Sequence, residues 1–159
     1  MTFNEDSFLN RYRERCSREE LCPAQIRRRI SKYLEKESVD KIISILEEEK
    51  FIDIVRFTNS YVRDKARFSL WGPKKIEYSL KSLDISSDII EFAINEHYSS
   101  VEGSENKNYV LEKIVLKKWN SLKGEESNES KRLKTLRFAL QRGFDYREID
   151  KIIKNINRL

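Results

Sequence analysis

Apolar residues recur along this chain at the three- and four-residue spacing of helices that bury one face. Two of these stretches begin with a proline, Pro23 and Pro73, and in both an isoleucine stands three places after the proline. Proline is favoured at the first position of a helix, because its missing N–H needs no partner there. The pattern therefore predicts helices over about 23–34 and 73–82.

A second amphipathic helix follows each of these after a short polar break. Ser38 and Ser86 stand before the two apolar runs and are the expected N-caps, since a hydroxyl there accepts a hydrogen bond from a free backbone N–H. The apolar residues of the runs are Ile42, Ile43, Ile45 and Leu46, and then Ile89, Ile90, Ala93 and Ile94. The helix pair thus repeats after roughly 50 residues, with the small slip that a changed loop length produces.

A third and weaker copy of the pair occupies the last part of the chain. Its first helix, with apolar residues over 136–140, is expected to end at Gly143, because glycine is common just beyond a helix. Asp145 is then expected to cap a last helix. The apolar residues of that last helix are Ile149, Ile152, Ile153 and Ile156.

A longer helix is expected before each pair, which completes a unit of three helices. These longer helices fall over about 5–20, 54–69 and 107–122, while 99–108 and 123–130 have the composition of exposed loops. We therefore predict an all-α protein of three tandem three-helix repeats that form an elongated, curved array. The predicted repeats are residues 1–50, 51–100 and 101–159.

The overall composition agrees with helices and disfavours a sheet or a membrane protein. Charged residues make up 37% of the chain, and there are only four glycines and two prolines. Threonine and valine, which favour strands, are sparse. No stretch approaches the roughly 20 apolar residues that a membrane-spanning helix needs, and the acidic, polar N-terminus does not fit a secretion signal. We expect a cytoplasmic protein that does not enter a membrane.

Signatures of catalysis and of metal binding are missing from the sequence. Cys16, Cys22 and His97 are the only cysteines and histidine, too few for the four ligands of a zinc site, and we expect the thiols to be reduced. His97 fits a solvated or hydrogen-bonded helix residue. The four glycines are isolated, so no phosphate-binding loop is present. We expect no enzymatic activity, no metal and no cofactor.

Charge is distributed in bands along the chain. Residues 131–159 hold nine Lys and Arg against three acids, whereas 84–106 hold six acids and no Lys or Arg. The candidate binding residues form three clusters: Arg27, Arg28, Arg29 and Lys32; Arg63, Lys65, Arg67, Lys74 and Lys75; Lys131, Arg132, Lys134, Arg137, Arg142 and Arg147. One such cluster alone is most simply a solvated helix face. Three of them in successive units predict a basic side of the array, suited to a phosphate backbone or an acidic filament groove.

The central segment 51–63 reads FIDIVRFTNSYVR and resembles the signature of the RecX family. The continuation, DKARF at 64–68 and WGPKKI at 71–76, is similar to that of Bacteroidetes-type members, and RGF at 142–144 fits the family's third unit. Ile54 stands where the family usually has a second acid, Thr58 replaces the usual alanine, and Asp84 the usual glycine. The matching residues, expected to be mostly structural, are Asp53, Arg56, Phe57, Tyr61, Trp71, Gly72, Ile76, Gly143 and Phe144.

Structural chemistry predicts a role for several of these signature residues. Asp53 is expected to cap the long helix of the second unit. The large aromatic side chains of Phe57, Tyr61 and Trp71 are expected to lock the first unit onto the second. Arg56 has two open roles, a salt bridge at a helix junction or a contact with a partner. Asp84 is expected to alter its turn, because glycine adopts a positive φ at less cost.

The resemblance implies binding to RecA–DNA filaments, with inhibition of strand exchange, ATPase and coprotease activities, by a cytoplasmic, non-catalytic protein. We expect this protein to be a monomer. An alternative left open by the residues is a nonspecific nucleic-acid-binding repeat module that acts by competing for DNA, since no groove-reading motif is present. A scaffold repeat protein with an unrelated partner is a third interpretation.

Overall fold

A computed structural model describes residues 3–99, 101–122, 124 and 127–156. All secondary structure in these residues is α-helical, as the apolar spacing predicted. The first three helices are α1 (Phe3–Cys16), α2 (Pro23–Ile30) and α3 (Lys36–Glu48). The next three are α4 (Ile54–Arg67), α5 (Pro73–Lys81) and α6 (Ser87–Ser99). The last three are α7 (Val101–Ser121), α8 (Asn128–Gln141) and α9 (Tyr146–Ile156).

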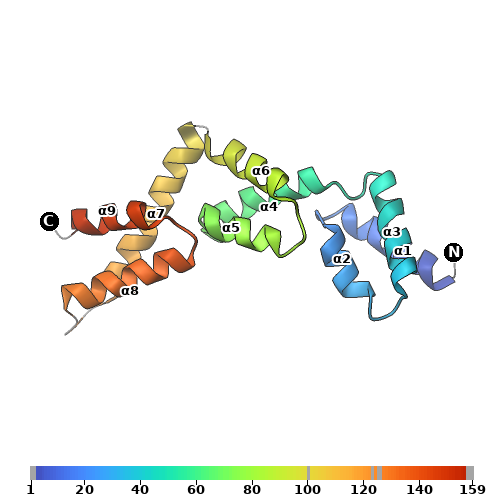
Figure 1. Ribbon diagram of the computed structural model, residues 1–159, viewed down its shortest axis with the longest axis horizontal. Helices are drawn as coiled ribbons and strands as arrows, with labels where there is room; N and C mark the ends of the chain where they lie inside the picture. Colours follow the sequence, from blue (N-terminus) through green and yellow to red (C-terminus); the bar gives the residue numbers. More distant parts are fainter. Residues whose placement is uncertain (1–2, 100, 123, 125–126, 157–159) are drawn as a thin grey trace.

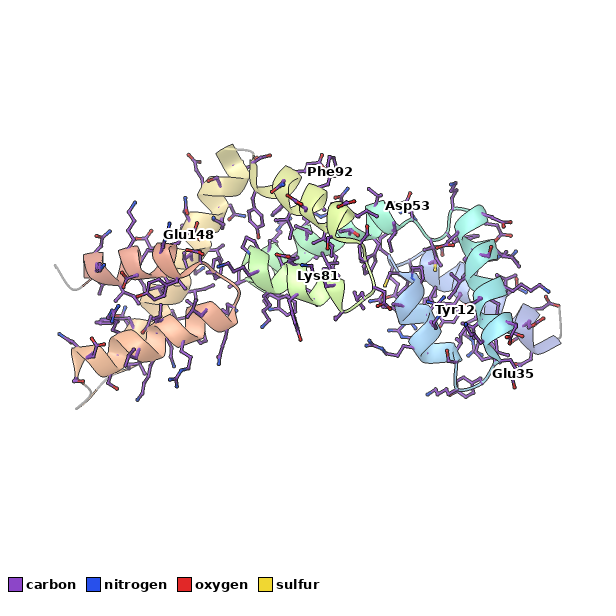
Figure 2. All side chains as sticks on the ribbon, in the orientation of Figure 1. Tyr12, Glu35, Asp53, Lys81, Phe92 and Glu148 are labelled. Carbon is purple, nitrogen blue, oxygen red and sulfur yellow. The ribbon has the colours of Figure 1, made fainter. Side chains whose placement is uncertain are left out.

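The helices form an elongated, bent array in which the two ends of the chain lie at opposite ends of the molecule (Figure 1). In the described part of the chain, buried apolar side chains gather in three separate clusters, and each cluster is built mainly by three consecutive helices. Tyr12, for example, is 4% exposed and lies among α1–α3, as Figure 2 shows. An array of three-helix units with separate small cores is therefore the observed architecture.

Local signals set the starts of several helices. Pro23 and Pro73 are the first residues of α2 and α5. The Asp53 carboxylate caps α4, at the junction between the first two units (Figure 2), and accepts hydrogen bonds from the N–H groups of Val55 and Arg56 at 3.0 and 2.9 Å. Asp145 accepts one from the Arg147 N–H at 2.9 Å before α9. These predictions are confirmed.

The prediction of Ser38 as an N-cap is wrong. The N-cap position of helix α3 is Glu35, three residues before Ser38, and the helix begins at Lys36. Ser38 therefore lies inside the first turn, where its hydroxyl donates a hydrogen bond to Glu5 of α1. This contact between two helices has no local sequence signal.

The predicted loops 99–108 and 123–130 are also partly wrong. Helix α7 already begins at Val101, since Gly103 alone costs a helix only about 1 kcal/mol and no proline interrupts the segment. Helix α8 begins at Asn128, where the Ser127 hydroxyl accepts a hydrogen bond from the Ser130 N–H at 3.2 Å. Residues 100, 123, 125 and 126 of the two predicted loops lie outside the described residues.

At each junction, residues near the start of the second helix of the preceding unit contribute to the core of the next unit. Cys22 and Ala24 pack into the core of the second unit, and Leu70 packs against the core of the third. The residues that meet in these contacts lie far apart in the sequence. The units are therefore linked by inserted side chains as well as by the chain itself.

The junction between the second and third units includes a close approach of two backbones. The Gly72 N–H donates to the Arg142 carbonyl at 2.6 Å, and the Lys74 N–H donates to the Gly143 carbonyl at 3.1 Å. A Cβ atom on Gly72 would lie 2.5 Å from the Gly143 carbonyl oxygen, and Gly143 itself has a φ of +88°. A side chain at either position is incompatible with this contact.

Trp71 belongs to this same junction, so its predicted place between the first and second units is wrong. It borders a small cavity together with Tyr98, Val110 and Phe144, which come from α6 and the third unit. Phe57 and Tyr61 do face the first unit, in a hollow that they share with residues 18–20. The aromatic residues of the signature thus serve two different junctions.

Two departures from the family pattern are accommodated without a change of fold. Asp84 adopts a φ of +59°, the same left-handed region as Gly143, so its turn is not altered as predicted. Aspartate tolerates this region better than most residues. Thr58 is fully buried, and its hydroxyl donates to the Ile54 carbonyl at 2.7 Å, which satisfies the extra polar group.

Candidate partner-binding surface

The three arginines of the first basic cluster lie on the last turn of α2, where the helix dipole favours positive charge, and Lys32 follows the end of the helix. Arg27, Arg28 and Arg29 are all exposed. Arg27 Nη2 donates to Asp40 Oδ1 of α3 at 2.9 Å, so this residue joins two helices. Within the part of the chain that the structure describes, Arg28 and Arg29 form no ion pair. These two guanidinium groups are available to a partner.

An exposed aromatic ring borders this cluster and was not identified from the sequence. Tyr33 is 59% exposed, and its ring stacks on Phe8 with 5.8 Å between centroids. Lys32 Nζ lies 5.0 Å from the centre of the Tyr33 ring, and the Arg11 guanidinium lies 5.4 Å from that of Phe8. The only signal in the sequence is an aromatic residue next to Lys32. Cations interleaved with exposed rings are typical of surfaces that bind single-stranded nucleic acid.

Three members of the second cluster contact residues of the junction between the second and third units. Lys65 and Lys75 place their ammonium groups 4.9 and 4.5 Å from the centre of the Trp71 ring, within the range of a cation–π contact. Lys74 Nζ pairs with Asp145 Oδ2 at 2.7 Å, and this keeps the pKa of Asp145 below its ordinary value. Lys74 and Lys75 thus contribute to the packing of the second unit against the third, while Lys65 contacts Trp71 from within the second unit.

Arg63 and Arg67, the other members of the second cluster, are exposed. Arg63 Nη2 donates to Ser60 Oγ at 2.9 Å and its Nε lies 3.6 Å from Asp64, a pair at the surface. The Arg67 guanidinium lies 5.3 Å from the centre of the Phe68 ring, and Phe68 is 73% exposed. A second cation–aromatic pair therefore faces solvent in the second unit.

The third cluster is likewise divided between residues with partners inside the protein and residues that face solvent. Arg132 donates to Asp150 at 3.0 Å and to Glu129 at 3.2 Å, and Arg142 donates to the Ser69 carbonyl at 3.1 Å. These two arginines hold helices and units together. The other members, Lys131, Lys134, Arg137 and Arg147, are exposed or half-buried. The fifteen predicted residues lie in three units along the array, not in one compact site (Figure 1).

The sequence left two roles open for Arg56, and the structure shows the salt bridge at a helix junction. Its Nε donates to Glu20 Oε1 at 2.6 Å, and its Nη2 lies 3.4 and 3.3 Å from the carbonyls of Lys50 and Phe51. It thus joins the start of α4 to the segments that follow α1 and α3. The hydrogen bonds from the backbone of Arg56 and of Val55 also hold the pKa of Asp53 below its ordinary value.

Among the residues that the structure describes, no three His, Cys, Asp or Glu side chains are grouped as metal ligands. Burial raises the pKa of the Cys16 and Cys22 thiols, which keeps them protonated. His97 is half-buried edge-on to Tyr98, and burial lowers its pKa. Within the described helices, none has the length and apolar character of a membrane span.

The fold and its surface define a class: a modular helical-repeat protein with exposed cations on each unit. Family models described as "RecX, second three-helix domain" and "RecX, third three-helix domain" match residues 55–94 and 110–153, together more than half of the chain. The chain belongs to the RecX family. It is 33% identical over 132 residues to "Regulatory protein RecX" of Clostridium botulinum, strain Eklund 17B. That match covers 82% of this chain and 59% of the relative.

Other relatives and solved structures agree with this family. "Regulatory protein RecX" of Prosthecochloris aestuarii is 27% identical over 113 residues, which are 71% of this chain and 68% of the relative. "Crystal structure of RecX from Lactobacillus salivarius" has a TM-score of 0.74 at 22% identity, with 98% of this chain and 97% of that chain covered. "Crystal structure of regulatory protein RecX" has a TM-score of 0.78 at 19% identity, with 94% and 71% covered. The three-helix repeat fold is thus shared, and the chain spans 59% of the length of the Clostridium botulinum relatives.

Proposed function

We propose that this protein binds the RecA recombinase–DNA filament and inhibits its recombinase, ATPase and coprotease activities, and so modulates DNA repair. Membership of a family whose members are named regulatory proteins supports this role. The observation that carries the proposal is an elongated array in which every unit presents exposed cations. An elongated body contacts several successive subunits of a filament, where a globular one contacts fewer.

The mechanism follows from the linkage of the units. Each unit has a small core and a few exposed cations, so each makes a weak contact with an acidic groove or a phosphate backbone. Because the units are covalently joined, their contacts add through effective concentration. One bound regulator then restrains several RecA subunits, and inhibition is substoichiometric to RecA. The protein acts as a monomer in this proposal.

The test is DNA-dependent ATP hydrolysis by RecA at fixed DNA, titrated with the protein and with a charge-reversed variant. Arg28, Arg29 and Lys32 are changed together to Glu, which leaves the Arg27–Asp40 pair intact. The control variant changes Lys41, Lys113 and Lys151 to Glu. These lysines are also exposed and lie outside the three clusters.

We expect the cluster variant to inhibit at least about tenfold less well, since each surface charge contributes up to ~1 kcal/mol. The control variant is expected to inhibit like the parent protein, and both variants to keep their helix content by circular dichroism. If the cluster variant inhibited as well as the control variant and the parent protein, the electrostatic basis of the proposal would be removed. The proposal as a whole would be refuted if the parent protein did not inhibit ATP hydrolysis and also did not co-purify with RecA, whether or not DNA and nucleotide were present.

The second candidate function is nonspecific binding to nucleic acid, with an effect on recombination through competition for DNA. The exposed rings of Tyr33 and Phe68 beside Lys32 and Arg67 favour this alternative, because bases stack on such rings. Affinity for bare single-stranded DNA equal to that for the filament would support it. So would inhibition that disappears when the DNA concentration is raised.

A further inference from the structure

A hollow of about 310 Å³ lies between α7 and α8, next to the junction with the second unit. Its apolar wall is made by Leu70, Ile114 and Phe138. Its charged lining residues are Lys117, Lys118 and Arg142, and no acidic residue lines it. The hollow therefore combines an apolar wall with cations alone.

The cations at this hollow are partly fixed in place. The Arg142 guanidinium donates to the Ser69 carbonyl at 3.1 Å and lies 5.0 Å from the centre of the Phe138 ring. Lys118 Nζ lies 5.5 Å from the same ring. Lys117 is exposed and forms no ion pair within the described part of the chain. Within the described residues, two positioned cations and one cation without an ion pair thus surround an apolar wall, and the fixed positions of the first two lower the entropic cost of binding an anion.

We propose that this α7–α8 hollow binds an acidic peptide segment of a partner protein through one apolar anchor side chain. The anchor fills the space against Leu70, Ile114 and Phe138, while flanking carboxylates pair with Lys117, Lys118 and Arg142. The volume lies at the lower end of the roughly 300–1,000 Å³ typical of ligand sites, which suits one large side chain.

Charge complementarity and the limited access to the Phe138 ring favour a peptide over nucleic acid. Stacking of a base needs an aromatic ring exposed to solvent, and Phe138 is half-buried against the core of the third unit, with both Lys118 and Arg142 over its ring. An aliphatic or aromatic anchor needs only the apolar wall. The proposal rests on the proposed function only for the identity of the partner protein. Binding of a peptide to the hollow is measured without RecA and is therefore tested separately.

The experiment uses the full chain and a fluorescein-labelled synthetic peptide in which one Phe is flanked on both sides by Asp and Glu. Binding is measured by fluorescence anisotropy. Two further probes are the same peptide with Phe replaced by Ser, and a labelled single-stranded oligonucleotide. The variants are Lys117→Glu at the hollow, Ser121→Phe to obstruct it, and Lys113→Glu as control. Lys113 lies on α7 with the same charge and is exposed, but it does not line the hollow.

We expect Lys117→Glu to weaken binding of the acidic peptide about five- to tenfold and Lys113→Glu to leave it within about twofold. Replacement of the Phe anchor by Ser should weaken binding by a similar factor, since a buried apolar side chain contributes much of such an interface. Ser121→Phe, which changes no charge, should also weaken it. These outcomes together support the proposal.

Three outcomes overturn it. Equal loss in the Lys117 and Lys113 variants would show attraction to a general basic surface. Equal binding of the peptides with and without Phe would show that the hollow receives no anchor. Tighter binding of the oligonucleotide, weakened by Lys117→Glu, would assign the hollow to nucleic acid. None of these results depends on RecA, so failure of the proposed function leaves this test unaffected.

Discussion

Replacement of Gly72 by Ala tests the junction between the second and third units most directly. Gly72 has an ordinary φ of −81°, so alanine introduces no backbone strain and acts only through its Cβ atom. That atom would lie 2.5 Å from the Gly143 carbonyl oxygen and 2.7 Å from the Phe144 nitrogen. Both neighbours are backbone atoms, which cannot rotate away as the end of a side chain does. The two backbones must therefore separate.

The magnitude follows from what the separation breaks. Ordinary contact begins at 3.4 Å, so the two segments must move apart by about 0.9 Å. The hydrogen bond from Gly72 to the Arg142 carbonyl then stretches from 2.6 Å to about 3.5 Å, and the bond from Lys74 to Gly143 also lengthens. Two backbone hydrogen bonds at ~1 kcal/mol each and overpacking of ~1–3 kcal/mol predict a loss of about 3–5 kcal/mol.

The assay is urea denaturation followed by circular dichroism and by tryptophan fluorescence. Trp71 borders the junction and Trp119 packs on the core of the third unit, so fluorescence reports this end of the array. We expect a lower midpoint for Gly72→Ala, with the fluorescence transition preceding the loss of helix. The control is Gly124→Ala, where a Cβ would meet nothing within 4 Å and only the φ of +108° costs energy. A midpoint for Gly72→Ala within the error of the parent protein would refute the close-contact argument.

Three further predictions concern caps, turns and pH. Asp53→Ala should cost about 1 kcal/mol of unfolding free energy in urea denaturation and Asp53→Asn much less, since only Ala removes the cap of α4; equal losses would assign the effect to charge. Asp84→Val should cost ~1–2 kcal/mol of unfolding free energy and so lower the thermal midpoint, and Asp84→Gly should not, because only Val is strained at a φ of +59°; the reverse order would contradict the assigned turn. The lowered pKa values of Asp53 and Asp145 predict stability that is complete above the ordinary aspartate pKa of about 4 and is lost as the pH falls through the lower folded-state values. Urea midpoints measured across this acidic range should fall less steeply for Asp53→Asn than for the parent protein, and parallel curves would contradict this assignment.

The sequence by itself determined the elements whose causes are local. The starts of α2, α4, α5 and α9 depend on Pro23, Asp53, Pro73 and Asp145, and each cap or first turn is completed within three residues of its signal. The apolar spacing determined the helical class and the threefold repeat, because each helix must bury one face. The similarity of 51–63 to the RecX signature led to the same family that the comparisons support.

The tertiary structure decided which polar residues remain available to a partner. Lys74 and Arg142 look like members of basic clusters in the sequence, but they bind Asp145 and Ser69, which lie 71 and 73 residues away. The fit of Gly72 against Gly143 and the hollow between α7 and α8 likewise depend on segments that are distant in the chain. Residue spacing reports neighbours on one helix, and it carries no information on which distant backbone or carbonyl will meet a given side chain. The division of the cations between junctions and surface was therefore set by the packing of the units.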